Sequence, residues 1–241
     1  SVLRFRDEEN KMEIFRYRDD VTAKDIDSAR EIWGLPTLYL PNRFDRGVVK
    51  TSDGTYNLPR NETLFDNHLH GFVQKREHKL ELCEVQGDKA VCRVSFEYDE
   101  KDEMFECFPL KFKWTLTFTL SEEGLRQDIE LESRADKALP VSICTHTCIN
   151  APIVDGGKQK SLRLQVPIEK KCILNERCLP TEELRELDTK DKRYKSGAMV
   201  PVLHQISNDM YTATETELDG KPFYGVIITD KHSGRRIEIG L

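Results

Sequence analysis

Apolar and polar residues alternate strictly along residues 112–120. The apolar positions lie two residues apart, and the positions between them carry lysine or threonine. Because successive side chains of a β-strand point to opposite faces, this pattern predicts a strand with one buried face. Turn-forming residues follow at 121–124, and alternation resumes through residues 125–132. The two segments therefore predict a β-hairpin.

Two further stretches have the same hairpin pattern. One runs from Leu80 through turn residues 86–89 to Phe96, and the other from Phe223 through residues 230–234 to Leu241. Repeated strands joined by Gly-containing turns are typical of antiparallel sheets. We therefore predict an all-β protein, built as a large antiparallel β-sandwich of two twisted sheets.

Helical patterns are few and short. Residues 23–33 contain an amphipathic stretch of one or two turns. Thr181 is placed to cap a second, Glu-rich segment that ends near Leu187. No linker, repeat or low-complexity segment interrupts the 241 residues, which predicts a single domain over residues 1–241.

Charge and composition narrow the classes of partner. The formal net charge is −6, and basic residues alternate with acidic ones, which predicts that nucleic acid is not a partner. No run of eighteen apolar residues occurs, and the first residues are charged, so we expect neither a membrane span nor a secretory signal. Seven cysteines, an odd number in a chain of this length, favour reduced thiols over a disulfide framework. These features predict a cytoplasmic protein.

Short motifs that contain histidine, arginine and asparagine occur in two parts of the chain. The first part runs from Trp33 to Phe72, and the second follows about seventy residues later, around His146. Further short motifs follow after residue 170. In chain order the motifs are Asn42-Arg43, Gly54-Thr55-Tyr56-Asn57-Leu58 with Asn61, Leu69-His70-Gly71, Pro140-Val141, Thr145-His146, Leu179-Pro180-Thr181-Glu182-Glu183, Asn208-Asp209 and Ser233-Gly234-Arg235.

This series resembles the aldose 1-epimerase (galactose mutarotase) superfamily in both order and spacing, and the resemblance covers nearly all of the chain after Trp33. It implies a galactose mutarotase-like fold and an isomerase that interconverts the α and β anomers of a sugar without cofactor or metal. The implied partner is a small sugar, a hexose or hexose phosphate. Lys75 and Arg76 are candidates to meet a phosphate, although exposed cations of this kind are usually solvated.

Anomer interconversion explains why such residues are needed. Opening the hemiacetal ring requires one group to remove the C1 hydroxyl proton and another to protonate the ring oxygen. A histidine, with an ordinary pKa of about 6.5, exchanges protons readily near neutral pH. The resemblance makes His146 the general acid and gives His70 a hydrogen bond to the ring oxygen or a neighbouring hydroxyl. It implies that Arg43 and Asp209 bind sugar hydroxyls.

Each of these residues has a simpler alternative. His68 lies two residues from His70, on the same face of an extended strand, and is an alternative functional histidine. Arg43 has Asp45 nearby as an ion-pair partner. Asp209 follows an asparagine, which is ordinary turn chemistry. The remaining histidines match no motif and are expected to be solvated; they are His78, His204 and His232.

A zinc site is the alternative reading of Cys144, His146 and Cys148. At a spacing of two, all three face one side of a strand and offer two thiols and an imidazole. Three residues along one extended strand span about 13 Å, too far for one ion with bonds near 2.3 Å. We therefore expect no metal.

The general base is missing from the matched motifs. The superfamily carries this glutamate well beyond its serine-glycine-arginine turn, and no residue of this chain matches it; position alone does not give Glu238 the role. We expect further residues after Leu241 in the complete protein. The alternative is a non-catalytic carbohydrate-binding protein on the same fold.

Overall fold

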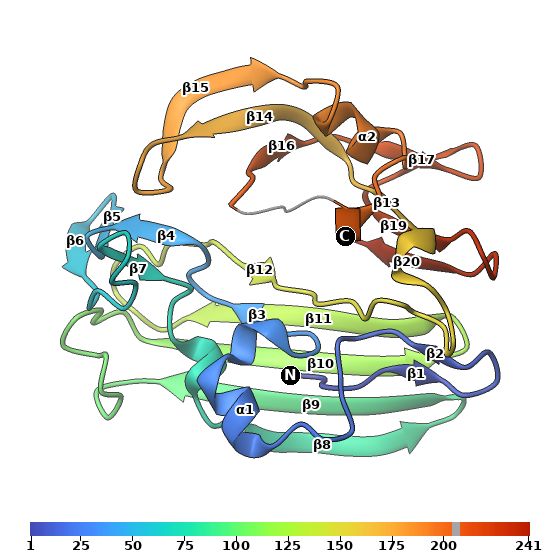
Figure 1. Ribbon diagram of the computed structural model, residues 1–241. Coiled ribbons are helices and arrows are strands. Elements are labelled where there is room, and N and C mark those ends of the chain that lie inside the picture. The colour runs from blue at the N-terminus through green and yellow to red at the C-terminus, as the bar shows by residue number, and fades with distance from the viewer. Residues whose placement is uncertain (204–207) are drawn as a thin grey trace. The chain divides into compact units, whose positions relative to one another are not determined.

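The computed structural model describes residues 1–203 and 208–241, and antiparallel strands make up most of its regular structure (Figure 1). His204 lies outside the described residues. Two compact units are present, a central unit, Leu38–Cys144, and a terminal unit, Ser1–Thr37 with Thr145–Leu241. Strands β3 (Thr37–Leu38) and β12 (Cys144–Thr145) lie where the chain passes from one unit to the other. The predicted all-β class is confirmed, whereas the single domain over residues 1–241 stays a prediction.

Four long strands form the main sheet of the central unit, in the order β11-β10-β9-β8 (Figure 1). Two of the predicted hairpins, β8–β9 and β10–β11, are confirmed, because each pairs antiparallel across a short turn. The strands are β8 (Lys79–Gln86), β9 (Lys89–Tyr98), β10 (Phe112–Ser121) and β11 (Gly124–Ser133).

The alternation along β10 produces the core of this unit. Phe112, Trp114, Leu116 and Phe118 are at most 7% exposed, while Leu120, at the end of the same face, is 45% exposed. Aromatic side chains of neighbouring elements pack against this face. Tyr98 stacks on Phe112 with ring centroids 4.8 Å apart, and an aromatic pair of this kind adds about 0.5–1.5 kcal/mol beyond the buried area.

Shorter elements complete the central unit and carry its candidate site residues. β4 (Arg43–Asp45) pairs with β7 (Asn67–Leu69), and β5 (Val48–Thr51) pairs with β6 (Gly54–Asn57), both antiparallel. The 3-10 turn η2 (Val73–Lys75) follows β7. Pairing of β4 with β7 sets Arg43 opposite Leu69, the residue before His70.

The terminal unit contains two three-stranded sheets, with strand orders β13-β19-β20 and β15-β14-β16. The third predicted hairpin is confirmed as β19 and β20. The strands of these sheets are β13 (Leu162–Gln165), β14 (Ile168–Leu174), β15 (Pro180–Glu186), β16 (Tyr211–Ala213), β19 (Gly225–Asp230) and β20 (Arg236–Gly240). Two short antiparallel pairs are β1 (Arg6–Asp7) with β2 (Met12–Glu13), and β17 (Thr216–Leu218) with β18 (Lys221–Phe223).

Helices in the described residues are short, and none is long and apolar enough to cross a bilayer. The predicted helical stretch at residues 23–33 is confirmed as α1 with a following 3-10 turn, and Thr22 and Asp25 form a capping box at its start. These and the remaining helical elements are α1 (Ala23–Ser28), η1 (Arg30–Ile32), η3 (Gln159–Ser161), α2 (Asp191–Lys195) and η4 (Pro201–Leu203).

The predicted helix after Thr181 is wrong, because this segment is strand β15 and pairs with β14. The Thr181 hydroxyl donates to the Ile173 carbonyl across the pair, at 3.0 Å, instead of capping a helix. Pro180 lacks an N–H and is tolerated as the first residue of an edge strand. Cross-strand pairing therefore outweighs the local helix signal.

Candidate functional site

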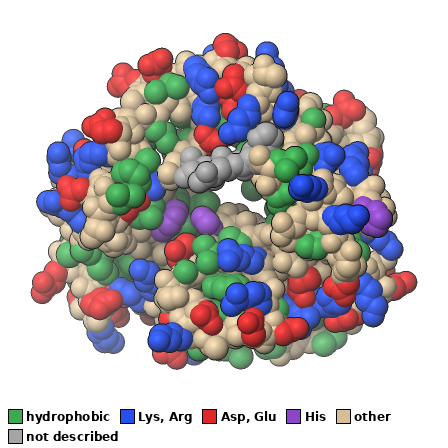
Figure 2. All heavy atoms as spheres, in the orientation of Figure 1, with side chains coloured by type: hydrophobic (Ala, Val, Ile, Leu, Met, Phe, Trp, Pro, Cys, Tyr) green, Lys and Arg blue, Asp and Glu red, His purple; other side chains and the backbone are tan. Residues whose placement is uncertain are grey.

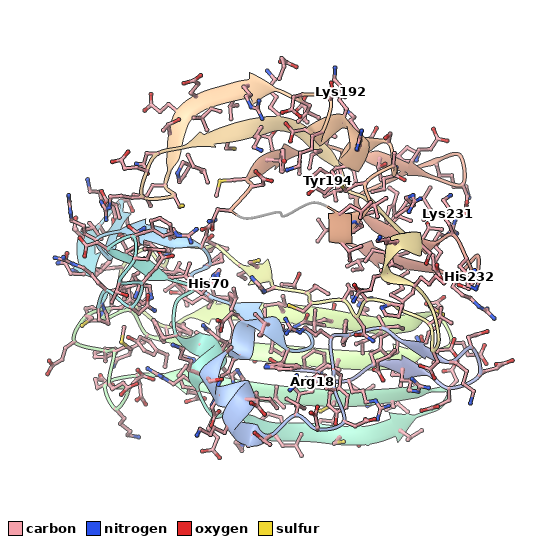
Figure 3. All side chains as sticks on the ribbon, in the orientation of Figure 1. Arg18, His70, Lys192, Tyr194, Lys231 and His232 are labelled. Atoms are coloured by element: carbon pink, nitrogen blue, oxygen red, sulfur yellow. The ribbon has the colours of Figure 1, made fainter. Side chains whose placement is uncertain are left out.

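His70 is held by the backbone of Asn42. It comes from the loop after β7 and has a left-handed φ of +65° (Figure 3). Its amide donates to the Asn42 carbonyl at 2.9 Å, and the Asn42 amide donates to Nδ1 of the imidazole at 3.3 Å. Because Nδ1 accepts, a neutral ring carries its proton on Nε2. This arrangement presents Nε2–H as the donor of the ring.

The backbone conformation and the close surroundings of Gly71 explain why a glycine follows His70. Its φ is +62°, and a Cβ at this position would lie 2.2 Å from the Tyr39 carbonyl oxygen. Only a residue without a side chain permits both the conformation and the close approach. The Leu-His-Gly motif therefore has a backbone reason in this chain.

Arg43 makes a buried ion pair that the sequence did not indicate. Its guanidinium pairs with Glu62 at 2.7 Å, rather than with Asp45 as the simpler alternative held. The two side chains are 11% and 12% exposed. Glu62 lies in no strand, and no pattern in the sequence marked it as a partner.

His68 is a packed histidine of the central unit. It is 2% exposed, and its Nδ1 donates to the Pro59 carbonyl oxygen at 2.6 Å. The strand ends at Leu69, so the two-residue spacing does not extend to His70. Burial lowers the pKa of His68. These contacts give His68 a structural role.

The expectation that His78 is solvated is wrong, whereas His232 is exposed as expected. The Nδ1 atom of His78 lies 2.9 Å from the Arg76 carbonyl oxygen. Burial lowers the pKa of His78.

Arg76, a candidate to meet a phosphate, forms an ion pair with Asp102 instead. Its Nε and Nη2 donate to the Asp102 carboxylate at 2.5 and 2.8 Å, so it offers little to a sugar phosphate.

We expect the free energy of unfolding to fall as the pH drops from about 7 to 5. His68 and His78 have folded-state pKa values below the ordinary 6.5, so below that pH the unfolded chain binds protons that the folded chain refuses. Stability therefore rises with pH in this window, whereas paired carboxylates act only at lower pH. Urea unfolding at several pH values measures the slope. His68→Gln should reduce the slope and His232→Gln should not; an equal slope in all three proteins would contradict the assignment.

His146 lies directly after β12 in an extended segment of the terminal unit. Its amide donates to the Pro36 carbonyl at 2.8 Å, and the Cys148 amide donates to the Gly34 carbonyl at 3.1 Å. The two side chains share one side, and Sγ of Cys148 lies 3.8 Å from Nδ1 of His146. The Cys148 thiol donates to the Glu31 carbonyl at 3.4 Å.

The thiols beside His146 are poor metal ligands. Burial raises the pKa of both Cys144 and Cys148. A zinc ligand must be a thiolate, so a raised pKa opposes metal binding. Within residues 1–203 and 208–241, no group of three His, Cys, Asp or Glu residues is arranged to hold a metal.

A cavity of about 610 Å³ lies in the terminal unit next to His146, and Thr145 and Thr147 line it. His146 itself does not line the cavity, which is consistent with strand alternation. Most of its lining residues are apolar, among them residues of β13, β19 and β20. Its size suits a small molecule, but it offers few hydrogen-bonding groups to the hydroxyls of a sugar.

Asp209 precedes β16 and pairs with Lys171 of β14 at 2.6 Å. Both residues line a cleft of about 560 Å³ in the terminal unit, together with Asn208 and Arg185. Asp209 is therefore more than a turn residue, because its carboxylate faces a cleft that has both donors and acceptors. No sequence motif pointed to Lys171, since cross-strand partners follow from register and not from local pattern.

Asp191 is the buried centre of this charged cluster. It is 1% exposed and accepts from the Tyr211 hydroxyl at 2.8 Å and from Arg185 at 3.1 Å. Lys171 lies 3.6 Å from the same carboxylate. Asp191 begins the short helix α2, whose Tyr194 is buried and whose Lys192 is exposed (Figure 3).

We expect Asp191→Ala to lower the free energy of unfolding by about 3 kcal/mol, because it removes the buried carboxylate that Tyr211, Arg185 and Lys171 share. Chemical denaturation measures the change. Asp219→Ala is the matched control, since the Arg236–Asp219 pair lies at the surface, with side chains 38% and 70% exposed. The control should leave the free energy of unfolding nearly unchanged, because an exposed ion pair contributes little. Equal losses in the two variants would mean that Asp191 does not organise the cluster.

The four predicted site residues fall into two pairs. Arg43 and His70 lie together in the central unit, joined through the pairing of β4 with β7. His146 and Asp209 belong to the terminal unit, on separate elements. Convergence of all four in one cleft stays a prediction.

On the face drawn in Figure 2, acidic and basic side chains are intermingled.

Comparison with known proteins identifies one family. The family model described as aldose 1-epimerase matches residues 2–240. The LacX proteins of Lactococcus lactis, one chromosomal and one plasmid-borne, are each 28% identical over 158 residues, which cover 63% of this chain and 51% of the relative. The chain thus spans about half the length of the curated relatives it matches.

Solved structures agree on the fold. A galactose mutarotase-like protein from Clostridium acetobutylicum superposes with a TM-score of 0.94 at 27% identity, covering 98% of this chain and 70% of that one. A GalM/aldose epimerase homologue from C. elegans has a TM-score of 0.68 at 15% identity, with coverage of 98% and 70%. The galactose mutarotase-like fold expected from the sequence is confirmed.

Proposed function

Because the chain belongs to the aldose 1-epimerase family, we propose that it binds an aldose or aldose phosphate and interconverts the α and β anomers by acid–base opening of the ring. It is then an isomerase that works with side-chain proton transfer alone. The location that we propose is the cytoplasm, where the seven cysteines would stay reduced.

The observation that carries the proposal is the geometry of His70. Its Nδ1 accepts from the Asn42 amide, so Nε2–H points away from that contact as a donor. A fixed tautomer suits a histidine that must donate to the ring oxygen or to a hydroxyl of a sugar. In His68 and His78 the Nδ1 atom faces a backbone carbonyl, whereas in His70 it accepts from a backbone amide.

The remaining roles are assigned on the same basis. His146 is the general acid that protonates the ring oxygen as the C1–O bond to the ring breaks. Arg43 donates to one sugar hydroxyl, and Asp209, beside Lys171 in its cleft, accepts from another. The base that removes the C1 hydroxyl proton is not assigned, because no residue in the sequence matches the family's glutamate.

The second candidate is a protein that binds sugar on the same fold without turning it over. Binding and catalysis are separable, because the hydroxyl-binding residues do not include the base. Loss of one member of an acid–base pair costs at least about 10²-fold in rate.

Two NMR measurements on the 241-residue chain test both candidates. Saturation transfer from the protein to D-galactose, D-glucose and their 6-phosphates reports binding. Exchange spectroscopy between the α and β anomeric signals reports turnover, compared with the same sugar without protein. Binding together with accelerated exchange supports the epimerase, and binding without it supports the sugar-binding protein. If none of the four sugars binds, both candidates fail.

A further inference from the structure

The Arg43 guanidinium is held on one edge by a carboxylate. Oε1 of Glu62 accepts from Nε at 2.9 Å and from Nη2 at 2.7 Å, and Oε2 also accepts from Nε at 2.9 Å. The ring of Phe65 lies against the guanidinium, with Cζ 5.3 Å from the ring centroid. Since a guanidinium is planar and rigid, these contacts fix the plane of the whole group.

Glu62 is itself held in place. Its amide donates to the Asn67 carbonyl at 3.1 Å, and the Asn67 amide donates to the Glu62 carbonyl at 3.3 Å. The Asn67 side-chain amide donates to Oε2 of Glu62 at 3.4 Å, and Asn67 is fully buried. Because both the backbone and the side chain of Glu62 are held, its carboxylate fixes the position of the Arg43 guanidinium.

The remaining guanidinium nitrogen, Nη1 of Arg43, takes no part in these contacts. Of the three guanidinium nitrogens, Nη1 is therefore the one that Glu62 leaves available to a ligand. Glu62 occupies the edge of the guanidinium formed by Nε and Nη2.

We infer that Glu62 is a positioning residue: it orients Arg43 and balances its charge, so that Arg43 presents Nη1 to one sugar hydroxyl. The inference rests on the proposed function, since it assumes that a sugar binds at Arg43. Arg43 pairs across β4 and β7 with Leu69, which places it beside the His70 segment. A fixed donor there loses little conformational entropy on binding, which favours affinity.

The test is a double-mutant cycle on aldose affinity, measured by calorimetry with D-galactose or D-glucose, whichever the wild-type chain binds. Glu62→Gln keeps the size of the side chain but removes its charge and one acceptor. We expect it to weaken binding about tenfold, the effect of one misplaced hydrogen bond. In an Arg43→Ala background the same change should have no effect, because Glu62 acts only through Arg43. Circular dichroism verifies that each variant is folded.

Asp102→Asn is the matched control. It opens the buried Arg76–Asp102 pair of the same unit, with side chains 15% and 7% exposed, and should leave the affinity unchanged. An equal loss in Asp102→Asn and Glu62→Gln, or an equal effect of Glu62→Gln in both backgrounds, would overturn the inference.

A second readout separates this inference from the proposed function. The Nε–H proton of Arg43, followed by NMR, should exchange with water slowly in the wild-type chain and at least about tenfold faster in Glu62→Gln, because the buried hydrogen bond is weakened. If no sugar binds, the proposed function fails while this measurement still reports on the pair. Unchanged exchange in Glu62→Gln would refute the positioning role.

Discussion

Replacing His146 by alanine is expected to lower the rate of anomer exchange by at least about 10²-fold, to near the uncatalysed rate. The general acid donates a proton to the ring oxygen in the transition state, and such a group contributes roughly 10²–10⁴-fold. Binding should change much less, since a proton donated only during reaction adds little to ground-state affinity. Exchange NMR of the anomers at saturating sugar measures the rate.

His232→Ala is the control for this experiment, because His232 is an exposed histidine in the turn after β19 of the same unit. It should leave the rate unchanged. A His146→Ala protein that retains most of the wild-type acceleration would show that another group is the acid. If His70→Ala then abolished the rate, the roles of the two histidines would have to be exchanged.

Gly71→Ala is expected to lower the free energy of unfolding by about 2–4 kcal/mol. The new Cβ would stand 2.2 Å from the Tyr39 carbonyl oxygen and 2.5 Å from the Leu40 nitrogen, and both are backbone atoms that cannot rotate away. The left-handed backbone adds about 1 kcal/mol of strain, and overpacking of a filled site costs a further 1–3 kcal/mol. Urea denaturation followed by circular dichroism measures the loss.

Gly87→Ala isolates the steric part of this effect. Gly87 has a φ of +64°, close to that of Gly71, but no atom lies within 4 Å of where its Cβ would be. This control carries the backbone strain alone and should cost about 1 kcal/mol. Similar losses at the two glycines would mean that the loop carrying His70 relaxes around the added carbon.

Local pattern by itself determined the long hairpins. In β10 the alternation of large apolar residues with lysine and threonine fixes which face is buried, because the period of two is a property of the extended backbone. The short motifs also identified the family. Asn42-Arg43, Leu69-His70-Gly71 and Thr145-His146 follow one another in the order and at the spacing that the family has. Both kinds of information lie in neighbouring residues.

Pattern failed where a residue's state depends on a distant partner. The segment after Thr181 has the residues of a capped helix, yet it forms β15 because β14 supplies hydrogen bonds along its length. Likewise, nothing local distinguishes His68, which is buried against the Pro59 carbonyl, from a solvated histidine.

Tertiary structure alone decided the partners of the candidate site. Glu62 meets Arg43 nineteen residues away, and Lys171 of β14 meets Asp209 in the loop before β16. A charged side chain has many opposite charges to choose from along a sequence in which 33% of residues are charged. Strand register and loop geometry decide which of them comes within about 3 Å, and ion pairs weaken steeply beyond contact in the presence of water.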